Sequence, residues 1–152
     1  MPDLNSLKSV LLIKCREYVD SRIATAQQAK TDAQAAANEE SKSSVGDKYE
    51  TTRSMMHLEG EQAAYQLAEA LKLRTLLDRL PDTQSKKIVS GSLVITNVNK
   101  IFVSIGIGKV NVNGEEILVV ASTSPLGKIL MGRCKNDRVT FNDQSMTILE
   151  VA

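Results

Sequence analysis

The sequence predicts an α+β protein in which an N-terminal antiparallel α-helical coiled-coil hairpin precedes an antiparallel β-sheet domain with one short helix. Two observations predict this division. Apolar residues recur every three or four positions as far as residue 80, which is the period of an amphipathic helix. After Pro81 the pattern changes to short runs rich in β-branched residues, separated by turn signals, as expected for strands. We therefore expect a hairpin over 1–80, a linker over 81–87 and a sheet domain over 88–152.

The first eighty residues are expected to form two long helices that pack against each other. No proline or glycine interrupts residues 3–37, and a second helical pattern continues from residue 51 until Pro81 stops it. Small residues such as Gly60 lie on the apolar stripe of the second helix, so its partner can approach closely. The pattern is lost over residues 38–50, which predicts that the chain reverses there. A dimeric coiled coil is the alternative, although a turn at Gly46 favours packing within one chain.

The C-terminal part contains local signals for hairpins. Asn113-Gly114 predicts a two-residue turn because both residues tolerate the positive φ of a type I′ turn, and Asn142-Asp143 predicts a second hairpin. The strands are expected over residues 89–95, 100–105, 109–112, 116–122, 138–141 and 145–151.

One short helix is expected between the two hairpins, over residues 125–131. Ser124 can cap it, Pro125 fits the first helical position, and Gly132 can end it in the left-handed conformation.

Composition and charge disfavour several classes of protein. There are 11 basic and 12 acidic residues up to Leu80, and 8 basic and 6 acidic after it, so neither part has the basic excess of a nucleic-acid-binding domain. Cys15 and Cys134 are far apart and there is one His, so neither a disulfide framework nor a zinc site is indicated. The apolar run 10–13 is too short to span a bilayer, and no targeting segment is recognised. A cytoplasmic protein is expected.

Acidic residues gather at the predicted reversal. Asp47 and Glu50 lie one helical turn apart, and Glu39 and Glu40 add acid on the other side of the loop. The pair also fits a capping box, in which Asp47 accepts a backbone hydrogen bond near Glu50 and Glu50 reaches back. Acid near a helix N-terminus is favoured by the macrodipole in any case. Both a functional site and a structural cap therefore remain open, and a solvated loop is the default for Glu39 and Glu40.

The segment at the short helix resembles a family signature. Residues 124–133, SPLGKILMGR, followed by NDRV at 136–139, are similar to the S-P-L-G-x-x-L-L-G-K…G-D-x-V signature in the C-terminal domain of bacterial Gre transcript-cleavage factors. The match keeps the cap, the proline, both glycines and the following strand in order. It implies an FKBP-like sheet domain after a coiled-coil hairpin, over the whole chain.

The predicted tip resembles the family's tip motif G-D-x-x-E-N-x-E-Y in part. Gly46, Asp47 and Glu50 match it. The family's Asn, acid and Tyr are replaced here by Thr51, Arg53 and Ser54.

The resemblance implies an accessory transcription elongation factor with no enzymatic activity of its own. In the family, the globular domain docks at the secondary channel of RNA polymerase and the hairpin reaches toward the active site. There the tip carboxylates support a Mg²⁺ ion and position a water that hydrolyses a backtracked transcript. By resemblance, Asp47 and Glu50 would be the catalytic and metal-supporting residues, only in the complex. The implied partners are RNA polymerase and, indirectly, nascent RNA, with no membrane, and the chain is expected to be a monomer.

The same resemblance implies that Ser124, Pro125, Leu126 and Gly127 bind the partner. A Pro125→Ala plus Gly127→Asp change is therefore expected to weaken polymerase binding and leave thermal stability nearly unchanged.

Three other functions are considered. A regulator that occupies the secondary channel without promoting cleavage is the main alternative, because the residues after Glu50 depart from the tip motif. A prolyl isomerase needs an aromatic-lined pocket, and the C-terminal part has only Phe102 and Phe141. A structural coiled-coil protein unrelated to polymerase is the third possibility, since fold does not dictate function.

Overall fold

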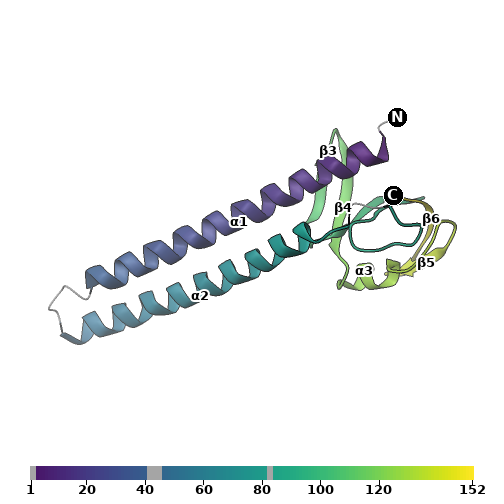
Figure 1. Cartoon of the computed structure of the whole chain (residues 1–152). Helices are drawn as coiled ribbons and strands as arrows, with labels where there is room; N and C mark the ends of the chain where they lie inside the picture. The colour runs from purple at the N-terminus through teal and green to yellow at the C-terminus, as the bar shows by residue number, and fades with distance from the viewer. Residues whose placement is uncertain (1–2, 41–45, 82–83) are drawn as a thin grey trace. The chain divides into compact units, whose positions relative to one another are not determined.

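The computed structural model describes residues 3–40, 46–81 and 84–152, with the side chains of residue 40 and of 46–53 left out. The chain divides into two compact units (Figure 1). The sheet unit comprises Met1–Arg16 and Thr75–Ala152, and the hairpin unit comprises Glu17–Arg74. The helices α1 (Leu4–Glu40) and α2 (Gly46–Asp78) each contribute to both units. The α+β class is confirmed: a long helical hairpin precedes a six-stranded sheet with one short helix.

In the sheet unit, six strands form one sheet in the order β3-β4-β2-β1-β6-β5. The helix α3 (Pro125–Leu130) connects β4 to β5. The strands are β1 (Leu93–Thr96), β2 (Lys100–Ser104), β3 (Gly108–Val112), β4 (Glu115–Ala121), β5 (Arg138–Phe141) and β6 (Gln144–Val151).

The sheet is mixed, so the expectation of a purely antiparallel sheet is wrong. β2 and β4 pair in parallel, from Lys100↔Ile117 to Ser104↔Ala121. β4 is the more apolar strand of the β3–β4 hairpin, and it takes the inner place beside β2 where both faces are covered. β3, with exposed Lys109, forms the edge, where polar side chains can reach water.

The beginning of the first strand was also predicted wrongly. β1 starts at Leu93, because the residues before it form a turn rather than continuing the strand. Ser92 N donates to the Val89 carbonyl at 3.0 Å, and Val89 N donates to Ser92 Oγ at 2.9 Å. Gly91 adopts a φ of +96°, a conformation that glycine takes without strain.

Both hairpin turns are confirmed. Asn113 and Gly114 have φ values of 53° and 83°, and Asn142 and Asp143 have 51° and 63°. A type I′ turn requires a positive φ at both central residues. Asn, Gly and Asp tolerate this conformation, which is why they occur at these positions.

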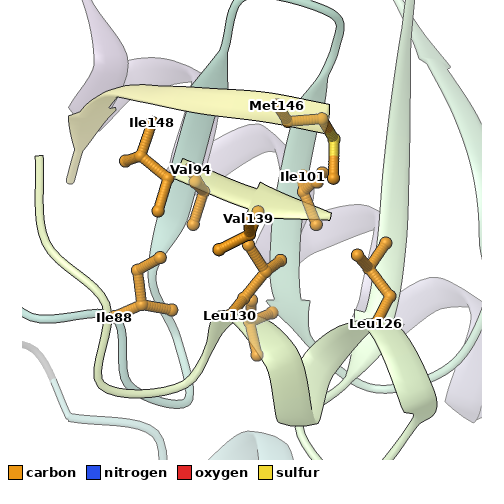
Figure 2. Close-up of a cluster of buried hydrophobic side chains, with 9 residues drawn as sticks. Ile88, Val94, Ile101, Leu126, Leu130, Val139, Met146 and Ile148 are labelled. Carbon is orange, nitrogen blue, oxygen red and sulfur yellow. The ribbon is translucent and has the colours of Figure 1, made fainter. Parts of the chain in front are cut away.

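The two faces of the sheet are covered by different helices. Successive residues of a strand point to opposite faces, so Val103 joins the face covered by α3 while Phe102 and Ser104 point the other way. There, Cys15 of α1 places its Sγ 3.6 Å from Ser104 Oγ. Figure 2 shows the core on the α3 face, formed by Ile88, Val94, Ile101, Val103, Leu126, Leu130, Val139, Met146 and Ile148.

The hairpin unit consists of two antiparallel helices (Figure 1). Small residues form the seam between them. A Cβ added to Gly60 would lie 3.6 Å from the Ala33 Cβ, so the helices approach closely at this point. The helices extend further into the expected reversal than the sequence indicated, since α1 runs to Glu40 and α2 begins at Gly46. The buried alanines of the seam are Ala26, Ala33, Ala37, Ala63 and Ala70.

Candidate functional site

The predicted tip site falls at the start of α2. Because α2 begins at Gly46, positions 47 and 50 both have helical backbone. Two positions three residues apart lie on the same face of a helix. The side chains of Asp47, Glu50 and Glu40 lie outside the described residues, so their role as metal-supporting or catalytic groups stays a prediction. Glu39, on the last turn of α1, is exposed.

The start of α2 bears on the capping alternative. An N-cap residue lies just outside the helix, whereas Asp47 is the second residue of α2. The side chains at 46–53 lie outside the described residues, so the capping box stays a prediction. The position remains favourable for a carboxylate, because the helix macrodipole is positive at this end.

Metal binding by the described side chains finds no support. Among them, no three His, Cys, Asp or Glu residues are grouped closely enough to hold an ion. The donors that the sequence offers for Mg²⁺ at the tip are carboxylates, which are the hard oxygen ligands this ion prefers.

The second predicted site is the segment that begins α3, and each of its residues has a structural role. Ser124 caps the helix: its Oγ accepts from Gly127 N at 3.0 Å and donates to the Ala121 carbonyl at 2.6 Å. Pro125 occupies the first turn, as expected. The helix ends before Gly132, whose φ is +81°. The cap, the proline and the terminal glycine are therefore confirmed in their predicted places.

Gly127 is required by packing. A Cβ at this position would lie 2.1 Å from the Ala121 carbonyl oxygen, which is backbone and cannot move aside cheaply. The expectation that a change including Gly127→Asp leaves thermal stability nearly unchanged is therefore wrong. Leu126 is also buried, at 6% exposure, in the core beneath α3. Of the four residues predicted to bind a partner, Pro125 is exposed and Ser124 is half-buried, and their role in binding stays a prediction.

The aromatic residues of the sheet unit do not form an isomerase-like pocket. Phe102 is fully buried in the core, so it cannot line a cleft, and Phe141 lies half-buried on the edge strand β5.

The structure brings together charged residues that the sequence did not connect. Lys87 forms an isolated antiparallel bridge with Cys134, which places Lys86 and Lys87 beside Arg133 and Lys135. We call these four exposed residues the basic cluster. No local signal could have revealed it, because β1–β4 and α3 separate the two segments in sequence and Lys86-Lys87 alone resembles a solvated linker.

A second feature without an assigned role is the thiol of Cys15. Burial raises the pKa of this thiol above its ordinary value of 9.0, and its contact with Ser104 lowers it by less. Cys15 and Cys134 are both free thiols.

These features define a two-unit α+β protein with a long helical hairpin and a mixed sheet, on which a capped helix closes one face. Over the described residues, no helix combines the length and apolar content needed to cross a bilayer. The sequence matches no protein-family model and no curated protein.

Two solved structures are similar to this chain over most of their length. One is the crystal structure of GreA factor homolog 1 (Gfh1) of Thermus thermophilus, with a TM-score of 0.36 and 15% identity, covering 90% of this chain and 93% of that chain. The other is described as the transcription factor Gfh1, with a TM-score of 0.35 and 15% identity, covering 89% of this chain and 91% of that chain. Likeness at this level establishes neither function nor partner.

Proposed function

We propose that this chain is a Gre-like accessory factor that binds bacterial RNA polymerase, places the hairpin tip in the secondary channel and stimulates cleavage of backtracked transcripts. The observation that carries this proposal is the SPLG segment. Its cap, its proline and both of its glycines are each used by the fold in the order of the family signature. A signature whose cap, proline and two glycines all serve one capped helix is unlike a chance match of small residues.

The helical hairpin supports the proposal through its reach and its chemistry. The 33 residues of α2 span about 50 Å at a rise of 1.5 Å per residue. A seam of alanines keeps the paired helices close together. Such a slim element can enter a channel that would exclude a globular domain, and it places positions 47 and 50 at its end.

The chemistry proposed for the tip is assistance to a site that polymerase provides. Mg²⁺ bound between polymerase and RNA would supply charge neutralisation and an activated water. In this chain, Asp47 would present a carboxylate oxygen toward that ion, and Glu50 would orient the attacking water or add a second oxygen. Two protein carboxylates are too few to hold Mg²⁺ tightly, so activity is expected only in the complex.

A regulator without cleavage activity is the second candidate. Thr51, Arg53 and Ser54 replace the Asn, acid and Tyr of the family's tip motif, and Arg53 puts positive charge where the family has negative charge. In this alternative, Glu39, Glu40, Asp47 and Glu50 would act as an acidic plug in the channel.

The test combines a pull-down on purified core RNA polymerase with a transcript-cleavage assay on a stalled complex. Asp47→Asn is expected to lower cleavage by about tenfold or more, because an anionic ligand is lost while the side-chain volume is kept. Glu59→Gln serves as the matched control, since Glu59 is an exposed acid of α2 further from its start, and it should keep full activity.

Three outcomes distinguish the candidates. Cleavage that depends on Asp47 supports the cleavage factor. Binding without stimulation of cleavage, with competition against a genuine cleavage factor, replaces it by the regulator. Absence of polymerase binding by the wild-type chain overturns both.

A further inference from the structure

The basic cluster lies where two distant segments of the sheet unit meet. Ile88 N donates to the Arg133 carbonyl and Gly132 N donates to the Ile88 carbonyl, both at 2.8 Å, and Lys87 bridges Cys134. One residue beyond that bridge, Lys86 and Lys135 line the same surface hollow. The backbone therefore fixes the positions from which all four cationic side chains extend.

Among the residues that the structure describes, none of the four cations of the cluster forms an ion pair, whereas Lys100 and Lys109 of the same unit pair with glutamates. Asp137, the nearest acid in sequence, accepts the Cys134 N–H at 2.8 Å and is engaged within its own loop. The sheet unit contains 12 basic and 8 acidic residues, a net charge of +4, and two of its acids, Asp3 and Glu150, line the hollow with Lys86 and Lys135.

Holding like charges close together destabilises a fold unless something else compensates. An anionic partner would relieve this repulsion and gain attraction. A patch of this kind favours a charge-complementary interface rather than a solvated surface.

We propose that the basic cluster is an interaction surface for a carboxylate-rich segment of a protein partner. Met131, an apolar residue at 36% exposure, follows α3 and is two residues from Arg133, so the surface combines cations with an apolar contact. Protein interfaces typically surround such a contact with charged residues at the rim.

The aromatic content of the sheet unit favours a protein partner over single-stranded nucleic acid. Single strands are usually held by aromatic side chains on which bases stack. The sheet unit has only Phe102 and Phe141, and the former is fully buried.

The surface is defined by this chain alone. Only the identification of its partner as RNA polymerase rests on the proposed function. In that setting, the basic cluster would dock an acidic face of polymerase, and the SPLG segment would hold α3 and the loop after it in place.

The test compares two variants of the full chain that lose the same charge. The cluster variant is Lys86→Gln, Lys87→Gln and Lys135→Gln. Arg133 is kept because its Nε donates to the Ile129 carbonyl at 3.4 Å at the end of α3. The control variant is Lys14→Gln, Arg79→Gln and Lys109→Gln, which are three cations of the sheet unit outside the cluster. Circular dichroism should show both variants folded like the wild type.

The first probes are a labelled 20-residue glutamate-rich peptide and a 20-nucleotide oligouridylate, titrated at low and physiological salt. The wild type and the control should bind the peptide with similar affinity, and the cluster variant about tenfold more weakly or worse. Equal peptide binding by the two variants would overturn the inference, as would no peptide binding by the wild type. Tighter binding of the oligouridylate than of the peptide would show that the surface is for RNA instead.

The second probe is core RNA polymerase. If the wild type binds it and the cluster variant loses about tenfold in affinity relative to the control, polymerase is the acidic partner. If both variants bind like the wild type, the docking assignment fails while the proposed function survives. If the wild type does not bind, the proposed function fails, and the peptide titration still decides whether the cluster recognises carboxylates.

Discussion

The two units of the molecule are stabilised by side chains of very different size. The fully buried residues of the sheet unit include Phe102, Leu93 and several isoleucines, whereas the hairpin unit buries Val19 and a row of alanines. Burial contributes free energy in proportion to the apolar area removed from water. A single position therefore matters much more in the sheet unit, while the hairpin unit depends on helix propensity summed over a long seam.

The largest expected effect comes from truncation in the sheet unit. Phe102→Ala should lower the free energy of unfolding by about 3–5 kcal/mol, because it leaves a cavity in a closed core. Val19→Ala in the hairpin unit removes two methyl groups and should cost only about 1–2 kcal/mol. Urea denaturation followed by circular dichroism measures both. Equal losses of unfolding free energy would mean that a buried side chain in the hairpin unit contributes as much to stability as one in the sheet core.

Overpacking at Gly127 should have the next largest effect. Gly127→Ala brings a methyl group against the Ala121 carbonyl and should destabilise the protein by about 1–3 kcal/mol. Gly106→Ala is the matched control, since no atom lies within 4 Å of the Cβ it adds. The two thermal midpoints give the comparison, and an unchanged midpoint for Gly127→Ala would show that the Ala121 backbone can shift freely.

The buried thiol of Cys15 should make stability depend on pH. Burial raises the pKa of this thiol, so the folded protein keeps its proton at a pH where the unfolded chain releases it. Its contribution is therefore fully present below pH 9 and is lost as the pH rises from there toward the folded-state pKa. Between pH 8 and pH 10, the free energy of unfolding should fall more for the wild type than for Cys15→Ala. Parallel declines would show that the thiol is open to solvent.

The smallest effect, and the only gain, is expected in the hairpin unit. Gly60→Ala should stabilise α2 by about 0.5–1 kcal/mol, because a glycine inside a helix costs this much relative to alanine. The added methyl would meet the Ala33 Cβ at 3.6 Å, an ordinary contact. Ala68→Gly, on an exposed part of the same helix, should lose a similar amount. A decrease in the free energy of unfolding for Gly60→Ala would mean that the seam between the helices has no room for another methyl group.

The features predicted correctly from the sequence are those encoded by neighbouring residues. Asn113-Gly114 determines its turn by its own φ preferences, and Ser124 and Pro125 determine the start of α3 in the same way. The parallel pairing of β2 with β4 was missed, because it depends on which strand of a hairpin is the more apolar when packed against the sheet. The spacing of apolar residues within one strand does not indicate which strand of the hairpin will pair with β2.

The candidate sites follow the same rule. The SPLG segment was recognised by its pattern, but the packing reason for Gly127 lies in Ala121, which belongs to β4. The basic cluster was missed because Lys86 and Lys135 become neighbours only when the sheet unit closes. The tip carboxylates remain a prediction from sequence.

The contact between Cys15 and Ser104 joins residues 89 positions apart and has a consequence for how the chain is made. A ribosome adds roughly 5–20 residues per second, so the start of α1 is synthesised several seconds before β2. During this interval the hairpin unit is synthesised, while Leu7, Leu11 and Cys15 have no sheet to cover them. The nascent chain therefore displays an apolar helix end that a chaperone can hold until β2 emerges to cover Cys15.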